Sequence, residues 1–218
     1  VRPGLGHERG PRLDSLASND EDWSPALHPD GDLLVFESDR GGDSDLYLAM
    51  RTGPTSFSAP VPLAINANGN DAAPSWTSDG AALYFTSDRG GTDQIWVAAF
   101  INSSFGAPTV IAEIADGAWG PEIAPDHLEL IYTTTSSPFD LRRAIRPTPT
   151  SPWQPVGSQG LEQINTNATE GWASFGSSGR LIHFETTRRG IVEIFTATRS
   201  DLSQPFTSPM LVDELNMT

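Results

Sequence analysis

Two aspartates are the first residues whose type and position could bind a ligand. Asp22 and Asp71 occupy the same place in two copies of a long sequence pattern, and each opens a strand-like run. Calcium takes oxygen ligands and suits clustered Asp side chains, so these two residues could form a calcium site. The alternative is that each carboxylate caps the turn that leads into its strand. The third and fourth copies carry Ala118 and Glu170 at this place, so a full ring of aspartates is lacking.

Three tryptophans lie at the start of the same strand-like runs: Trp23, Trp119 and Trp172. If exposed, their rings could stack on a sugar ring or on a partner's peptide. The alternative is that they fill the space between neighbouring repeats. With the carboxylates, they give the candidate ligand-binding set of Asp22, Trp23, Asp71, Trp119, Glu170 and Trp172.

Residues for catalysis cannot be assigned. The sequence has no cysteine and no Gly-x-Ser-x-Gly segment. The histidines fall at unrelated positions in the repeat and lack metal-ligand spacing; they are His7, His28, His127 and His183. We therefore expect no catalytic residue.

The elements that must position the candidate residues are copies of a repeat of roughly 48 residues. Residues 22–42 are echoed by residues 71–91, and both segments end in Ser-Asp-Arg-Gly-Gly; two more degenerate copies follow. The apolar residues alternate with period two, and Asp-Gly or Arg-Gly-Gly turns separate the runs, which predicts four short antiparallel strands per copy. The density of proline and glycine excludes helices of useful length.

A single four-stranded meander cannot cover both of its faces, so neighbouring copies must stack around an axis. We therefore expect an all-β fold with one domain over residues 1–218, a β-propeller of four-stranded antiparallel blades. The four blades are expected at about 20–66, 67–115, 116–164 and 165–216, with an extra strand-like segment at 1–19. Residues 11–18 either close a four-bladed ring against the last blade, which we favour, or the chain is an arc of a larger propeller. An open arc could be completed by a second chain, as a homo-oligomer.

The repeat resembles the WD40-like (PD40, TolB-type) family of bacterial β-propeller repeats, found in TolB and in many exported proteins. The family unit reads Asp-x-x-Pro-x-x-Ser-x-Asp-Gly, an apolar strand, then Ser-Asp-Arg-Gly-Gly, and the first two copies match it nearly completely. The third copy has Thr134-Thr-Ser136 at the second turn, and the fourth has Ala173 in place of the proline. In such propellers the strand that begins at Asp22 or Asp71 lies innermost.

The resemblance implies a periplasmic or extracellular binding propeller, not an enzyme, that presents its channel mouth and loops to a protein, peptide or glycan. The alternative is a hydrolase. It would be a calcium-dependent lactonase-like or glycosidase-like propeller that uses channel carboxylates, or the propeller part of a larger hydrolase.

Charge and hydropathy exclude two classes of partner. The formal net charge is −15 and every one of the 13 cationic side chains is an arginine, so the phosphates of a nucleic acid would be repelled. No apolar run approaches the roughly 20 residues that a membrane-spanning helix needs, so we expect no membrane insertion. In the turns, we expect Arg40 and Arg89 to pair with a neighbouring carboxylate.

Overall fold

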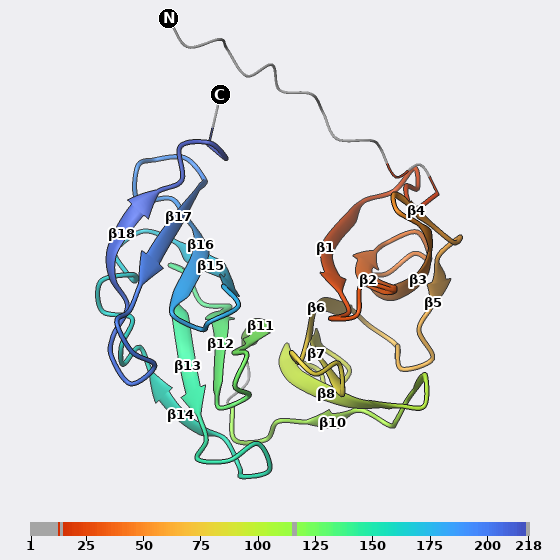
Figure 1. Cartoon of the computed structure of the whole chain (residues 1–218), viewed down its shortest axis with the longest axis horizontal. Coiled ribbons are helices and arrows are strands. Elements are labelled where there is room, and N and C mark those ends of the chain that lie inside the picture. Colours follow the sequence, from red (N-terminus) through yellow and green to blue (C-terminus); the bar gives the residue numbers. More distant parts are fainter. Residues whose placement is uncertain (1–12, 14, 115–116, 217–218) are drawn as a thin grey trace, which may run out of the picture.

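The four repeats fold as four antiparallel blades of one β-propeller. The computed structural model describes residue 13, residues 15–114 and residues 117–216. The blades follow one another around the molecule, from the first (β1–β5, red and orange) to the fourth (β15–β18, blue), as Figure 1 shows. No helix that could cross a membrane occurs within these residues.

Each blade is a meander in which consecutive strands pair, and its last strand is short or split. The first blade contains β1 (Asp22–Leu27), β2 (Leu33–Ser38), β3 (Asp45–Gly53), β4 (Ser56–Phe57) and β5 (Val61–Pro62). The second contains β6 (Asp71–Trp76), β7 (Ala82–Ser87), β8 (Gln94–Ile101), β9 (Ser104–Phe105) and β10 (Thr109–Val110). The third contains β11 (Ala118–Ile123), β12 (Glu129–Thr134), β13 (Leu141–Ile145) and β14 (Gln154–Gly157). The fourth contains β15 (Glu170–Phe175), β16 (Leu181–Thr186), β17 (Glu193–Thr198) and β18 (Thr207–Leu211).

The first strand of every blade carries a β-bulge at its third residue. The pairing register shifts there in all four blades, and the backbone φ is positive. The bulged residues are Ser24 (φ 48°), Ala73 (φ 48°), Gly120 (φ 61°) and Trp172 (φ 46°). A bulge leaves its extra residue out of the ladder, so the N–H of that residue needs another acceptor.

The preceding blade supplies the acceptor at each of three junctions. The Ala73 N–H donates to Glu37 Oε2 (3.1 Å), the Gly120 N–H to Thr86 Oγ1 (3.0 Å), and the Trp172 N–H to Thr133 Oγ1 (3.3 Å). Glu37, Thr86 and Thr133 all occupy the next-to-last position of a second strand. One repeated hydrogen bond therefore fixes each blade against its predecessor near the axis.

Apolar side chains fill the same three junctions. Between the first and second blades, for example, Val35 and Leu46 pack against Leu83 and Phe85. The turn that links two blades contributes two further branched residues to each junction: Leu63 and Ile65, Ile111 and Ile114, and Leu161 and Ile164. Burial of these faces is the main stabilising contribution, because neither face of an isolated meander is covered.

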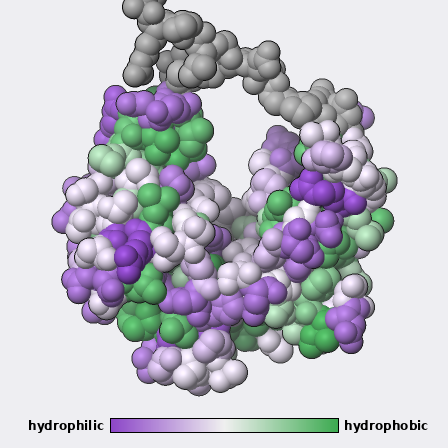
Figure 2. Space-filling view, in the orientation of Figure 1, coloured by the Kyte–Doolittle hydropathy of each residue, from purple (hydrophilic) through white to green (hydrophobic). Residues whose placement is uncertain are grey.

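The ring is open between the first and fourth blades. In the described residues, no strand of the first blade contacts a strand of the fourth. Figure 2 shows a notch between these two blades. The prediction that residues 11–18 close the ring against the last blade is not met in the described residues: Leu13 and Leu16 pack against the first blade, and the strands of the first and fourth blades make no contact. Residues 11, 12 and 14 of the segment lie outside the described residues, as do residues 1–10.

The open junction predicts unequal energetic roles for equivalent residues. Leu27 ends the first strand of the first blade and is 48% exposed, whereas Ile123, at the same place in the third blade, is 5% exposed. We expect Leu27→Ala to lower the free energy of unfolding by less than about 1 kcal/mol, and Ile123→Ala to lower it by about 2–5 kcal/mol. Urea-induced unfolding measures both values. Equal losses would show that the face of the first blade is buried, contrary to the structure.

Candidate functional site

The first candidate carboxylate, Asp22, is bonded within its own blade. Arg40 Nη2 lies 2.5 Å from Asp22 Oδ1, and the Ser18 N–H donates to Asp22 Oδ2 (3.0 Å). Burial raises the pKa of Asp22, but the bonds from Arg40, Ser38 and Ser18 outweigh it, so this pKa lies below its ordinary value. The carboxylate ties the turn before β1 to the turn after β2.

The second candidate carboxylate, Asp71, makes the same contacts in the second blade. It is 1% exposed, and its two oxygens accept bonds from Arg89 Nη2 (2.6 Å) and from the Ala67 N–H (2.7 Å). Arg89 also donates to the Ile65 carbonyl (2.9 Å) and to Ser87 Oγ (2.7 Å). The prediction that Arg40 and Arg89 pair with a neighbouring carboxylate is thus confirmed, and their partners are Asp22 and Asp71.

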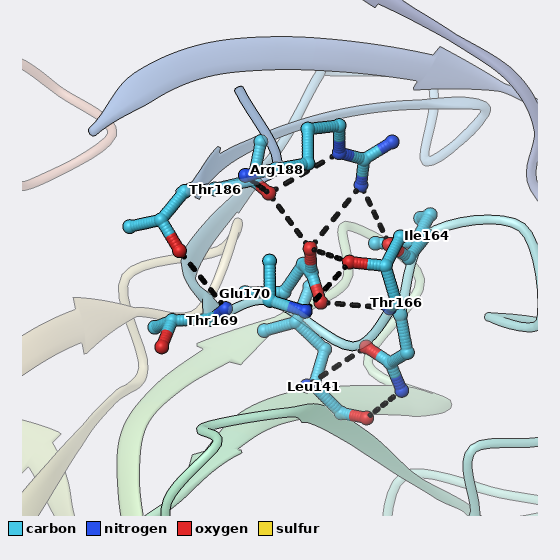
Figure 3. A network of polar contacts seen from close by, with 10 residues as sticks. Leu141, Ile164, Thr166, Thr169, Glu170, Thr186 and Arg188 are labelled. Carbon is cyan, nitrogen blue, oxygen red and sulfur yellow. Dashed lines mark hydrogen bonds and ion pairs between the residues drawn. The ribbon is translucent and has the colours of Figure 1, made fainter. Parts of the chain in front are cut away.

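Glu170 holds the corresponding place in the fourth blade and is fully buried (Figure 3). It accepts bonds from Thr186 Oγ1 (2.7 Å), Thr166 Oγ1 (2.8 Å) and the Thr166 N–H (2.8 Å), and it lies 3.5 Å from Arg188 Nη2. Two of these donors are hydroxyl groups, whereas the donors to Asp71 are a guanidinium and a backbone N–H. Glu170 too is engaged inside its blade.

The third blade lacks both members of the pair. Ala118 stands in the place of the aspartate, and Ser136 stands where the arginine would be. A buried arginine without its carboxylate, or the reverse, would leave an uncompensated charge, which is strongly destabilising. Loss of the carboxylate and the arginine together avoids that energetic cost. This indicates that the pair stabilises its own blade.

The three candidate carboxylates therefore lie in separate blades, each bonded to its own turn. Among the described residues, no group of three or more His, Cys, Asp or Glu side chains is arranged to hold a metal ion. A calcium site on Asp22 and Asp71 would have to compete with Arg40 and Arg89 for the carboxylate oxygens.

The three candidate tryptophans, in contrast, are brought together. Trp23, Trp119 and Trp172 line one cavity of about 220 Å³ together with Ser24 and Glu37. The Trp119 and Trp172 rings meet edge to face with centroids 5.4 Å apart, and Trp23 and Trp172 are 42% and 43% exposed. We call these five residues the axial tryptophan site, because they come from or adjoin the innermost strands of three blades.

Trp172 occupies a backbone conformation that does not suit it. Its φ of 46° lies in the left-handed region, where a bulky side chain costs on the order of 1–3 kcal/mol. Ser24, Ala73 and Gly120 are all small at the equivalent bulge. A large aromatic ring is therefore kept at a strained position that lines the cavity.

Sequence reasoning missed two glutamates, one in this site and one in a cavity that adjoins it. Glu37 accepts bonds from Ser24 Oγ (3.2 Å), Ser44 Oγ (2.7 Å) and the Ala73 N–H. Glu122 accepts from Ser75 Oγ (2.9 Å) in the second blade and from the Phe175 N–H (3.0 Å) in the fourth, and burial raises its pKa.

A signal for Glu122 was present in the repeat alignment. Its place in the other first strands is taken by the small residues Ala26, Ser75 and Ser174. Only the hydrogen bonds show that the long Glu122 side chain links its own blade, the third, to the second and fourth blades.

Comparison with known proteins identifies the family. The family model PD40, described as the TolB beta propeller domain, matches residues 23–148, more than half of the chain. A search of the curated proteins found no match.

Solved structures with the same fold include two TolB proteins and an enzyme. A protein described as a TolB from Agrobacterium tumefaciens is 18% identical, with a TM-score of 0.62, 90% of this chain covered and 63% of that chain. TolB from Acinetobacter baumannii is 18% identical, with a TM-score of 0.58, 84% of this chain covered and 41% of that chain. A thermostable family-43 glycoside hydrolase is 16% identical, with a TM-score of 0.68, 91% of this chain covered and 81% of that chain. The chain thus spans less than two thirds of the two TolB chains.

The third blade lacks both the carboxylate and the arginine of the pair, and mutation can produce the same absence in the second blade. Asp71→Ala should lower the free energy of unfolding by about 3–5 kcal/mol, because it leaves Arg89 buried without its partner. Adding Arg89→Ser recreates the Ala118 and Ser136 combination. The double variant should lose less than the sum of the two single losses, by about 1–3 kcal/mol.

The control is the same cycle at Asp22 and Arg40, where the carboxylate is more exposed and the coupling should be smaller. Chemical denaturation supplies all the values. Strictly additive losses at Asp71 and Arg89 would contradict a pair that acts as a unit.

Proposed function

The chain belongs to the TolB β-propeller domain family, and we propose that it is an exported, non-catalytic binding propeller that engages a partner protein at its axis. The observation that carries this proposal is the axial tryptophan site. Exposed Trp side chains from different blades converge on one cavity. Tryptophan is enriched among the residues that dominate binding energy at protein interfaces.

The bonding of the candidate carboxylates within their own blades also supports a binding function. Asp22, Asp71 and Glu170 are used within their blades, which leaves the aromatic rings as the accessible chemistry near the axis. The site takes a segment of the partner that can insert between indole rings. A sugar ring would also stack on such a surface, so a glycan carried by the partner is the second ligand class.

The alternative function is hydrolysis, and the fold similarity to a family-43 glycoside hydrolase is its specific support. Glycoside hydrolysis needs two carboxyl groups that flank the scissile bond, one of them with a raised pKa. Glu122 has a raised pKa, but its oxygens are bonded to Ser75 and to the Phe175 N–H. We therefore favour binding, with periplasmic or extracellular localisation.

Removal of the aromatic rings tests the binding function. Purified wild-type chain, Trp172→Gly and Trp119→Ala would be used as baits for extracellular and periplasmic proteins, with quantification by mass spectrometry. We expect a partner retained by the wild type to be lost from both variants, because the rings that contact it are gone. Met210→Ala, in β18 and 59% exposed, is the control variant and should retain the partner. Equal retention by all four proteins would contradict binding at the axis.

Calcium separates the binding function from a calcium-dependent hydrolase. An ion that binds only the native state must raise its stability. For a non-catalytic propeller whose Asp22 and Asp71 are paired with arginine, we expect the melting temperature to be unchanged by millimolar calcium and by chelator. A rise with calcium that Asp71→Asn abolishes would favour the metal-dependent enzyme.

A further inference from the structure

We propose that the axial tryptophan site is a cage for an alkylammonium cation, the head group of a lysine side chain or of a quaternary ammonium compound. This inference rests on the proposed function and names the chemical class that its site would take. It depends on the aromatic composition of the cavity, on the acidic groups around it and on the conformation of Trp172.

The composition of the cavity is that of a cation cage. Three of its five lining residues are tryptophan, and a fourth is Glu37. The face of an indole ring carries negative electrostatic potential, and tryptophan is the aromatic residue that attracts ammonium groups most strongly. The edge-to-face arrangement of Trp119 and Trp172 presents two walls at a steep angle of 69°, as a cage requires and a flat sugar platform does not.

The surroundings of the cage are acidic. Two further cavities adjoin it and share its tryptophans; carboxyl groups line both, Asp93 in one and Glu122 in the other, although burial raises the pKa of each and so favours its neutral form. None of the described residues that line the three cavities is basic. The carboxylate of Glu37 is held by bonds from Ser24, Ser44 and Ala73, so its position is set before any ligand arrives. With a net charge of −15, the protein attracts cations and repels anions.

The backbone at Trp172 is the third observation. Gly120 shows that the bulge accepts glycine, and glycine would remove the strain. A strained bulky residue that persists at an exposed site indicates a functional constraint. The same conformation carries the Trp172 ring to the cavity while its N–H bonds Thr133 in the preceding blade.

The test compares a cation with its neutral isostere. Isothermal titration calorimetry of the 218-residue chain would use choline and 3,3-dimethylbutan-1-ol, in which a tert-butyl group replaces trimethylammonium. We expect choline to bind at least about tenfold more tightly than the alcohol, because only choline gains the attraction of the ring faces. Equal affinities would overturn the proposal and would indicate an apolar pocket instead. The absence of choline binding would also overturn the proposal.

Variants make the assignment specific. Trp172→Gly should lose choline binding while the chain still unfolds in one cooperative melting transition, because the relief of backbone strain offsets part of the lost contact with Trp119. Trp119→Ala should weaken binding by about tenfold, and Met210→Ala should leave it unchanged. Choline binding that survives in Trp172→Gly would overturn the cage.

A further arm identifies the source of the cation. Short peptides with one lysine, one trimethyllysine or one acetyllysine would be titrated under the same conditions. Tighter binding of the lysine or trimethyllysine peptide than of choline, with no binding of the acetyllysine peptide, assigns the cage to a partner protein. Tighter binding of choline assigns it to a small quaternary ammonium compound. If partner capture depends on Trp172 but no cation binds, the proposed function stands and the cage is wrong.

Discussion

The structure depends on one repeated hydrogen bond, from the N–H of a bulged residue to a side chain of the preceding blade. A buried N–H without an acceptor costs about 1–3 kcal/mol, so a bulge of this kind is tolerated only where a neighbour supplies the acceptor. Glu37, Thr86 and Thr133 supply it at three successive junctions. The apolar faces give most of the stability, but this bond sets the position of each blade relative to the next.

The same bulge creates the candidate site. It breaks the alternation of the first strand, so side chains at its second and third positions are carried toward the axis. Trp23 and Trp119 stand at the second position and Trp172 at the third, and all three line one cavity. The junction residue Glu37 lines that cavity as well, so blade stacking and ligand chemistry share one carboxylate.

The sequence predicted the fold class, the four blades and the pairing of turn arginines with carboxylates, because each of these is encoded by a local pattern that recurs. It also placed Trp23, Trp119 and Trp172 at the start of the innermost strands, and it left packing and binding open as alternatives. It could not predict that the ring is open, because Leu13 and Leu16 match the inter-blade turns equally well in a closed ring and in an arc. The ion pair between Asp71 and Arg89 could have been predicted, because the repeat alignment shows that the third blade lacks both residues.

Amide hydrogen exchange followed by NMR tests the central claim most directly, at the four bulged residues. The account predicts slow exchange at Ala73, Gly120 and Trp172, whose N–H groups are bonded to the preceding blade. It predicts fast exchange at Ser24, because no described blade precedes the first one. Exchange at Ser24 as slow as at the other three would show that its junction is filled. Fast exchange at Ala73 and Gly120 would show that the repeated bond does not hold the blades together.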